Sequence, residues 1–210
     1  MTDMTKRAMS VRSLPFLTTA VFLVFGPSAE LVRAQAAPLS PAAQQARADH
    51  GTPATAAVAG VRNFTRVDQT IALGGALSPE AVAALKQAGY KSIVNLRLAS
   101  EPGANVVEEK KAAEADGLRY FHLPFSHATP DAAAIDEFLK IVRRPENLPM
   151  MLHCATGARA SMFWAVKRVM IDGWPVDKAM NELPDLAGHV GEPMRTFILD
   201  YLKSHGKTRP

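Results

Sequence analysis

The sequence has a single cysteine, Cys154, among its 210 residues, so no disulfide can form within one chain. It shows no basic stripe of the kind that binds nucleic acid, and it has no internal repeat. Histidines are few, and His50, His122, His189 and His205 lack the spacing that is typical of metal ligands. We therefore expect a protein without a disulfide, a metal, another cofactor or a nucleic-acid partner.

The first 36 residues have the features of a secretory signal peptide. Three basic side chains precede the apolar stretch from Leu14 to Phe25, and Ala34-Gln35-Ala36 has the small-x-small form of a cleavage site. The stretch has twelve residues, whereas a membrane-spanning helix needs about 20, and an uncleaved N-terminal anchor is the alternative. We expect a periplasmic or secreted protein with no membrane contact after cleavage, and Met4 and Met9 are alternative starts.

The rest of the chain divides into a linker and one domain. Residues 37–61 are rich in Ala, Pro, Gln and Thr without apolar periodicity, which predicts a flexible tether. The length of residues 62–207 suits one domain with one core. Removing residues 1–36 takes four basic and two acidic side chains away from 24 and 20, so the remaining net charge is +2.

Short β-branched runs alternate with helical patterns through residues 62–207. Strands are predicted as a pair around Gln69 that ends at 72–75, and then at 91–96, 118–123 and 149–153. Helices are predicted at about 79–88, 104–115, 131–142, 158–172, 175–183 and 192–203. This alternation predicts an α/β fold with a central, mainly parallel sheet flanked by helices, in which sites lie at the carboxyl ends of the strands.

Several residues are predicted to act at helix ends and on helix surfaces. Ser78 is expected to be an N-cap with Pro79 at the first helical position. Thr129-Pro130-Asp131 is expected to cap the helix that follows it. The run Glu108-Glu109-Lys110-Lys111 is interpreted as a solvated helix face with charge pairs.

Cys154 follows the last predicted strand and precedes a helix, on a turn that contains Gly157. At such a helix start, unpaired backbone N–H groups and the positive end of the dipole favour a thiolate and surround a tetrahedral oxyanion. The amides concerned are those of Ala155, Thr156, Gly157 and Ala158. Gly157 lets the turn close, and Arg159 supplies a planar, permanently charged group for anion oxygens. The sequence therefore predicts a catalytic loop with Cys154 as its nucleophile, rather than a buried structural cysteine.

Three further residues are candidates for supporting roles. His153 either orients and polarises the loop or is a core histidine. Arg97, at the carboxyl end of a strand, either reaches the pocket or forms a surface ion pair with Glu101. Ser161 carries the hydroxyl group that lies nearest to Arg159 on its C-terminal side.

The chain resembles the cysteine-dependent protein phosphatases of the tyrosine and dual-specificity type, and within them the bacterial phosphatase-like domain called beta-lactamase-hydrolase-like. The resemblance covers roughly residues 64–186. It rests on Ile71 to Gly75, Ile93 to Arg97, Tyr120 to Pro124 and His153 to Ser161. It implies a phosphatase-like α/β fold and attack by Cys154 on phosphorus to form a cysteinyl-phosphate. It also implies that the loop amides and Arg159 hold the oxyanion and that no metal is needed.

The sequence departs from the pattern of this family in three ways. Only four residues separate Cys154 from Arg159, where the signature has five. The bacterial branch that the chain resembles often shows this shorter form, and so do rhodanese-type sulfurtransferases. Ala160 stands where Ser or Thr is usual. The usual aspartic acid does not follow residues 121–124, so His127 and Asp131 are the candidates for the general acid.

Three functions follow from these observations. The first is an exported phosphatase that acts on a phosphorylated small molecule or protein, with phosphotyrosine as one candidate substrate. The second is a sulfurtransferase that takes sulfur from a sulfane-sulfur donor and carries it as a persulfide on Cys154. The third is a non-catalytic module that binds an anion or a phosphoprotein. The sequence does not determine the oligomeric state.

Overall fold

The computed structural model describes residues 57–183 and 190–208, which fall within one compact unit, Ser40–Pro210. The predicted signal peptide, and all but residues 57–61 of the predicted linker, lie outside this part of the chain. Within it, no helix is both long enough and apolar enough to cross a membrane.

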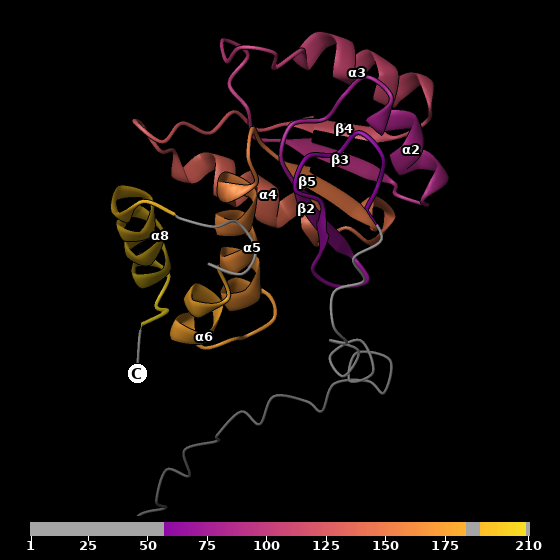
Figure 1. The fold of residues 1–210 in the computed structure, drawn as a ribbon. Helices are drawn as coiled ribbons and strands as arrows, with labels where there is room; N and C mark the ends of the chain where they lie inside the picture. Colours follow the sequence, from indigo (N-terminus) through magenta and orange to yellow (C-terminus); the bar gives the residue numbers. More distant parts are fainter. Residues whose placement is uncertain (1–56, 184–189, 209–210) are drawn as a thin grey trace, which may run out of the picture. The chain divides into compact units, whose positions relative to one another are not determined.

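Five strands form one sheet in the order β1-β2-β5-β3-β4 (Figure 1). They are β1 (Thr65–Arg66), β2 (Ile71–Gly74), β3 (Ser92–Asn95), β4 (Arg119–His122) and β5 (Met150–His153). β1 runs antiparallel to β2, and the other pairs are parallel. His153 pairs with Gly74 on one side and with Asn95 on the other, so three strands end together beside Cys154.

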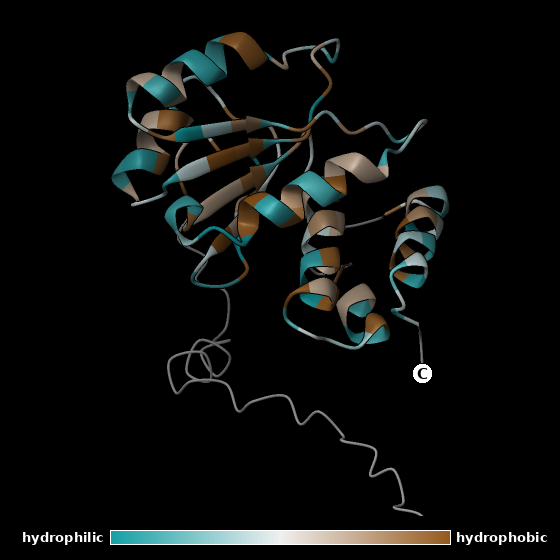
Figure 2. Cartoon of the chain, turned by 180° about the vertical axis from the view of Figure 1, so that it is seen from behind, coloured by the Kyte–Doolittle hydropathy of each residue, from teal (hydrophilic) through white to brown (hydrophobic). Residues whose placement is uncertain are grey.

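Side chains alternate between the two faces of the sheet, and each face is covered by helices. Along β5, Met150 and Leu152 belong to one apolar cluster and Met151 to another. The cluster with Met151 includes residues of α2 (Ala81–Gln87) and α3 (Val106–Ala115), and the larger cluster includes residues of α4 (Ala132–Val142) and α5 (Ala158–Met170). Figure 2 shows brown, hydrophobic segments along the strands between these helices.

The larger cluster continues through α5 to the C-terminal helices. α5 is buried along almost its whole length because α4, α6 (Val176–Asn181) and α8 (Glu192–Ser204) all pack against it. The short 3-10 helix η1 (Pro145–Asn147) leads into β5. Burial on several sides fixes the direction of α5, and the N-terminus of α5 carries the Cys154 loop.

The fold class predicted from the sequence is confirmed, and so are the approximate positions of its strands and helices. One predicted cap is wrong. α2 has Glu80 at its N-cap, and no side chain caps it there. Ser78 lies in the preceding turn instead, because its amide donates to the Gly60 carbonyl oxygen at 2.9 Å and its own carbonyl oxygen accepts from Ala81 at 3.0 Å.

Candidate active site

The loop from Cys154 to Gly157 joins the end of β5 to the start of α5, as the sequence predicted. The Cys154 amide donates to the Gly74 carbonyl oxygen at 3.2 Å, and the Gly157 amide points at the Cys154 sulfur, with 3.1 Å between N and Sγ. In the described part of the chain, the amides of Ala155, Thr156 and Ala158 make no hydrogen bond. These N–H groups are therefore available to an anion above the sulfur.

Two glycines allow this loop to form. Gly157 has a φ of 111°, a value that residues with a side chain rarely adopt. At Gly75 a Cβ atom would lie 2.9 Å from the Ala155 carbonyl oxygen, so only glycine allows the segment after β2 to pass this close beneath the loop. The loop is held from that side, because Ala76 donates to the same oxygen at 3.1 Å and Asn63 Nδ2 donates to the Thr156 oxygen at 2.9 Å.

Arg159 is buried in the first turn of α5 and held by a carboxylate. Its guanidinium donates to both oxygens of Glu101, with Nη1–Oε1 2.6 Å and Nη2–Oε2 2.8 Å, and Nη1 also donates to the carbonyl oxygens of Leu96 and Phe125. Its Nε is a buried donor with no partner. Burial lowers the pKa of Arg159, but its bond to Glu101 and the nearby Cys154 outweigh burial and raise that pKa. Arg159 is thus a fixed cation whose Nε–H group is free for an anion.

Glu101 is the acceptor that organises the cations of the site. Burial raises its pKa, but hydrogen bonds from Arg159 and from the Leu98 amide outweigh this effect and hold the pKa at about 2. Arg97 Nε also donates to Glu101 at 3.3 Å, and its Nη atoms donate to the carbonyl oxygens of Gly103 and Pro102 at 2.7 and 2.6 Å. Arg97 is buried, so its pair with Glu101 is not on the surface, and it shapes the segment that brings Glu101 to Arg159.

His153 is fully buried, and its side chain points to the α3 side of the sheet. Its Nε2 lies 2.9 Å from Glu109 Oε1, which also accepts from Asn95 Nδ2 at 3.1 Å. Its Nδ1 has no hydrogen-bond partner within residues 57–183 and 190–208. The interpretation of Glu109 as part of a solvated face is wrong, since only 8% of its side chain is exposed. Lys110 of the same run forms its ion pair with Glu114.

The two candidates for the general acid lie in the segment after β4. His127 is close enough to Arg159 and Glu101 for both charges to act on it. Burial and Arg159 lower the pKa of His127, while Glu101 opposes them. Asp131 is the N-cap of α4, and its carboxylate accepts from the Ala133 amide at 2.9 Å. The structure therefore brings His127 towards the charged groups of the site and gives Asp131 a role at a helix end.

Ser161 is buried one turn into α5. Its hydroxyl donates back to the Gly157 carbonyl oxygen at 3.2 Å, and its amide donates to the same oxygen at 2.9 Å. Its observed bonds therefore connect the first turn of the helix to the loop. Ala160, which occupies the position where a hydroxyl is usual, is also buried.

Sequence reasoning missed Glu109 and Asn95 as neighbours of the loop, and it considered Glu101 only as a surface partner of Arg97. The separation of 58 residues between Glu101 and Arg159 gives no local signal of their contact. Only the parallel register of β3 and β5 brings Asn95 beside His153.

These elements are arranged as in the cysteine-dependent phosphatases of the tyrosine and dual-specificity type. They are a buried cysteine after the central strand, free amides at a helix N-terminus, and an arginine fixed below them. A family model described as DSP-PTPase phosphatase fused to NAD+ kinase matches residues 56–187, and the chain belongs to this family. The match includes both Cys154 and Arg159.

Curated relatives are two proteins called beta-lactamase hydrolase-like protein, from Xylella fastidiosa strains Temecula1 and 9a5c. Each is 31% identical over 111 residues, which are 51% of this chain and 25% of the relative. The match thus spans about a quarter of the length of these relatives.

Solved structures share the fold. A DUF442 protein from Shewanella putrefaciens CN-32 has a TM-score of 0.58 and 19% identity, covering 69% of this chain and 94% of that one. The core catalytic domain of the PP-IP phosphatase SIW14 from S. cerevisiae has a TM-score of 0.57 and 20% identity, covering 72% and 92%. TpbA from P. aeruginosa has a TM-score of 0.54 and 21% identity, covering 68% and 84%.

Proposed function

We propose that this protein hydrolyses phosphate monoesters through a covalent intermediate on Cys154. The observation that carries the proposal is the arrangement of donors around the sulfur. The Gly157 amide points at Sγ from 3.1 Å, and Arg159, whose Nε is a buried donor without a partner among the described residues, is close enough for its charge to act on Cys154. A tetrahedral dianion bound there would receive N–H donors from the loop and a fixed positive charge from Arg159.

In the proposed first step, the Cys154 thiolate forms a bond to phosphorus as the bond from phosphorus to the leaving oxygen breaks. The leaving oxygen takes a proton from a general acid, and the phosphoryl group remains on sulfur as a cysteinyl-phosphate. In the second step water loses its proton to the same residue and forms a bond to phosphorus as the bond from sulfur to phosphorus breaks, which yields inorganic phosphate and the Cys154 thiolate. The loop amides and Arg159 stabilise the oxyanion in both steps.

We assign the proton transfer to His127 in preference to Asp131. The charge of Arg159 acts on His127, which supports a position at the site, whereas the carboxylate of Asp131 is engaged by the start of α4. An imidazolium is a competent acid near neutral pH. Phosphotyrosine is one candidate substrate, and small phosphate esters are the other.

Sulfur transfer is the second candidate function, and the four-residue spacing between Cys154 and Arg159 favours it. Here the thiolate would attack a sulfane sulfur, form a persulfide and release the rest of the donor. An acceptor thiophile would then remove the outer sulfur. This route does not depend on a general acid in the way that ester hydrolysis does. A third candidate is an anion-binding or phosphoprotein-binding module without turnover.

We also propose that the protein is exported and works in the periplasm or outside the cell. The basic N-terminal residues, the short apolar stretch and the Ala34-Gln35-Ala36 motif support this proposal. Mass spectrometry of the protein from cell fractions would test it. A mature N-terminus at Ala37 in the periplasmic or secreted fraction is expected, and an uncleaved chain in the membrane fraction would refute it.

A paired turnover assay tests the function. The reduced protein and its Cys154→Ser and Arg159→Ala variants are given an aryl phosphate in one arm, and thiosulfate with cyanide in the other. Phosphate release that both substitutions abolish is the expected result. Thiocyanate formation without phosphate release would assign sulfur transfer instead. Anion binding that survives Cys154→Ser, with no turnover in either arm, would assign the binding module.

A further inference from the structure

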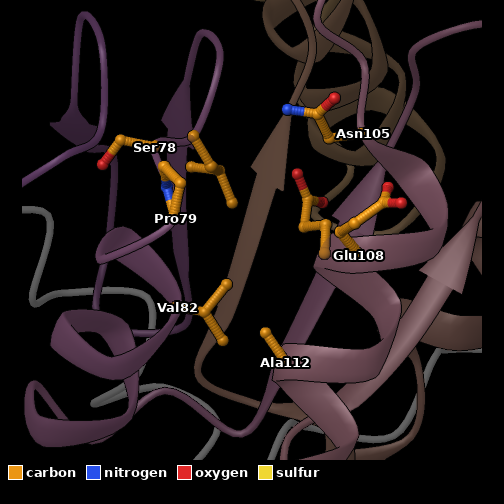
Figure 3. Close-up of a pocket in the computed structure, with 8 residues that line it drawn as sticks. Ser78, Pro79, Val82, Asn105, Glu108 and Ala112 are labelled. Atoms are coloured by element: carbon orange, nitrogen blue, oxygen red, sulfur yellow. The ribbon is translucent and has the colours of Figure 1, made fainter.

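A cavity of about 100 Å³ lies between the start of α2 and the first turns of α3 (Figure 3). Its walls come from two segments that are distant in sequence. They are Leu77, Ser78, Pro79 and Val82 on one side, and Asn105, Glu108, Glu109 and Ala112 on the other. Figure 3 shows Val82 and Ala112 facing each other across one end of the cavity, with Asn105 at the other end.

The walls combine an apolar part with two carboxylates. Asn105, Glu108, Glu109 and Ala112 recur with the spacing of one helix face, so α3 turns both acids to the same side. Lys110 and Lys111, which follow them in sequence, do not line the cavity. No ion pair engages Glu108 in residues 57–183 and 190–208, and Glu108 is exposed, so its carboxylate borders the cavity from the solvent side.

Glu109 connects this cavity with the candidate active site. Its side chain is more than nine-tenths buried, and it lines the cavity. Its Oε1 lies 2.9 Å from Nε2 of His153, the residue immediately before Cys154. A charge placed in the cavity therefore lies beside a carboxylate that also contacts Asn95 and His153, and His153 is the residue from which the catalytic loop begins.

We propose that this cavity binds a small organic cation, an ammonium or guanidinium group on a short apolar stem. The bound cation changes the reactivity of Cys154 through Glu109 and His153. The volume equals that of about three water molecules in the liquid, which suits a stem of about four carbon atoms. The stem would contact Val82 and Ala112, while the cationic group meets Glu108 and Glu109.

The effect on Cys154 has a definite sign. A bound cation partly neutralises the negative field that Glu109 directs towards His153 and the loop. Less negative charge nearby favours the thiolate of Cys154 over the thiol. Occupancy should therefore make the sulfur more reactive. This regulatory role rests on the proposed function, whereas cation binding and thiol reactivity can be measured without any turnover.

Binding is tested on the full chain with n-butylammonium and, as an uncharged probe of the same shape, n-butanol. Titration followed by amide NMR shifts of α3 should give a dissociation constant on the order of 1 mM for the cation, because so few atoms make contact. Binding of n-butanol, and of n-butylammonium to Glu108→Gln, should be about tenfold weaker. The matched control is Glu114→Gln, an acid of the same helix that pairs with Lys110 outside the cavity and should bind as the wild type does.

Coupling is tested by the rate at which iodoacetamide alkylates Cys154, followed by mass spectrometry. Saturating n-butylammonium should raise this rate about twofold or more in the wild type. It should leave the rate unchanged in Ala112→Leu, which fills the cavity. If a capped lysine amide binds more tightly than n-butylammonium, the source of the cation is a basic side chain of a polypeptide. If n-butylammonium binds more tightly, the source is a free amine.

Three results would overturn the proposal. Equal affinity for n-butylammonium and n-butanol, or unchanged affinity in Glu108→Gln, would show that the cavity does not recognise a cation. Binding with no change in the alkylation rate would show that the cavity is not coupled to Cys154. Loss of phosphatase turnover alone would affect neither readout, so failure of the proposed function stays distinguishable.

Discussion

Gly157 illustrates how one backbone conformation supports the candidate site. We expect Gly157→Ala to reduce kcat/KM for an aryl phosphate by tenfold or more, because its φ of 111° is strained for alanine and its amide faces the Cys154 sulfur. The unfolding free energy should fall by about 1–2 kcal/mol. The matched control is Gly173→Ala, which has a φ of 72° and open space around the added Cβ. An equal loss of activity in both variants would contradict a local role for Gly157.

The lowered pKa of Glu101 predicts that the stability of the protein depends on pH. Its pKa in the folded protein is about 2, below the ordinary 4.5, so its ionised form stabilises the fold above about pH 4.5. That contribution, on the order of 2 kcal/mol, is lost as the pH falls from about 4.5 towards 2. The free energy of unfolding, measured in urea between pH 5.5 and 3, should therefore fall more steeply for the wild type than for Glu101→Gln. Parallel pH curves for the two proteins would contradict the assignment.

His127 predicts where the rate should depend on pH. Because burial and Arg159 lower its pKa below the ordinary 6.5, its protonated form is lost as the pH rises through a value below 6.5. For an alkyl phosphate, whose leaving group needs a proton, kcat/KM should decline along that limb. His127→Gln should abolish the limb and reduce the rate about 10²-fold, with little effect on a good aryl leaving group. A limb that survives the substitution would assign the proton to another residue.

At the scale of elements, the start of α4 shows whether Asp131 acts as a helix cap or as the general acid. Asp131→Ala should lower the unfolding free energy by about 1 kcal/mol, because the Ala133 amide loses its cap. Its kcat/KM for the same alkyl phosphate should stay within twofold of the wild-type value. Asp131→Asn, which can still cap, should recover most of the stability. A large loss of rate in Asp131→Asn would instead make Asp131 the acid.

The strand order explains why the site lies where it does. β5 pairs with both β2 and β3, so its carboxyl end meets the segments that follow both neighbours. The segment after β2 supplies Gly75 and Ala76, and the segment after β3 supplies Glu101. A loop at an edge strand would receive support from one side only.

At the scale of the whole molecule, aromatic packing in the core supports the position of Arg159 in the site. Phe163 of α5 is fully buried and makes edge-to-face contacts with Phe125 and Phe138, at centroid distances of 5.0 and 5.5 Å. Phe125 in turn accepts a bond from Arg159 through its carbonyl oxygen. Phe163→Ala should cost about 3–5 kcal/mol of unfolding free energy, measured in urea, and should also weaken phosphate binding. Phe163→Leu should lose less of both, and unchanged stability in Phe163→Ala would contradict this account.

The sequence alone determined the alternation of strands and helices, and it determined the Cys154 loop with Gly157 and Arg159. These features depend on short-range periodicity and on the conformation of a few neighbouring residues, which the order of residues specifies directly. It also placed His127 among the candidates for the acid. The sequence pattern alone did not decide between the roles open to His153 and Arg97.

Only the tertiary structure decided which distant groups meet at the loop. Glu101 reaches Arg159 across 58 residues, and Glu109 reaches His153 across 44. Both glutamates look like surface charges in sequence, because a helix or loop pattern does not reveal which buried side chain will face each of them. The pairing of β5 with β3 and the packing of α3 on the sheet bring these groups together, and hydrogen bonds in a buried region of low dielectric are stronger than in water.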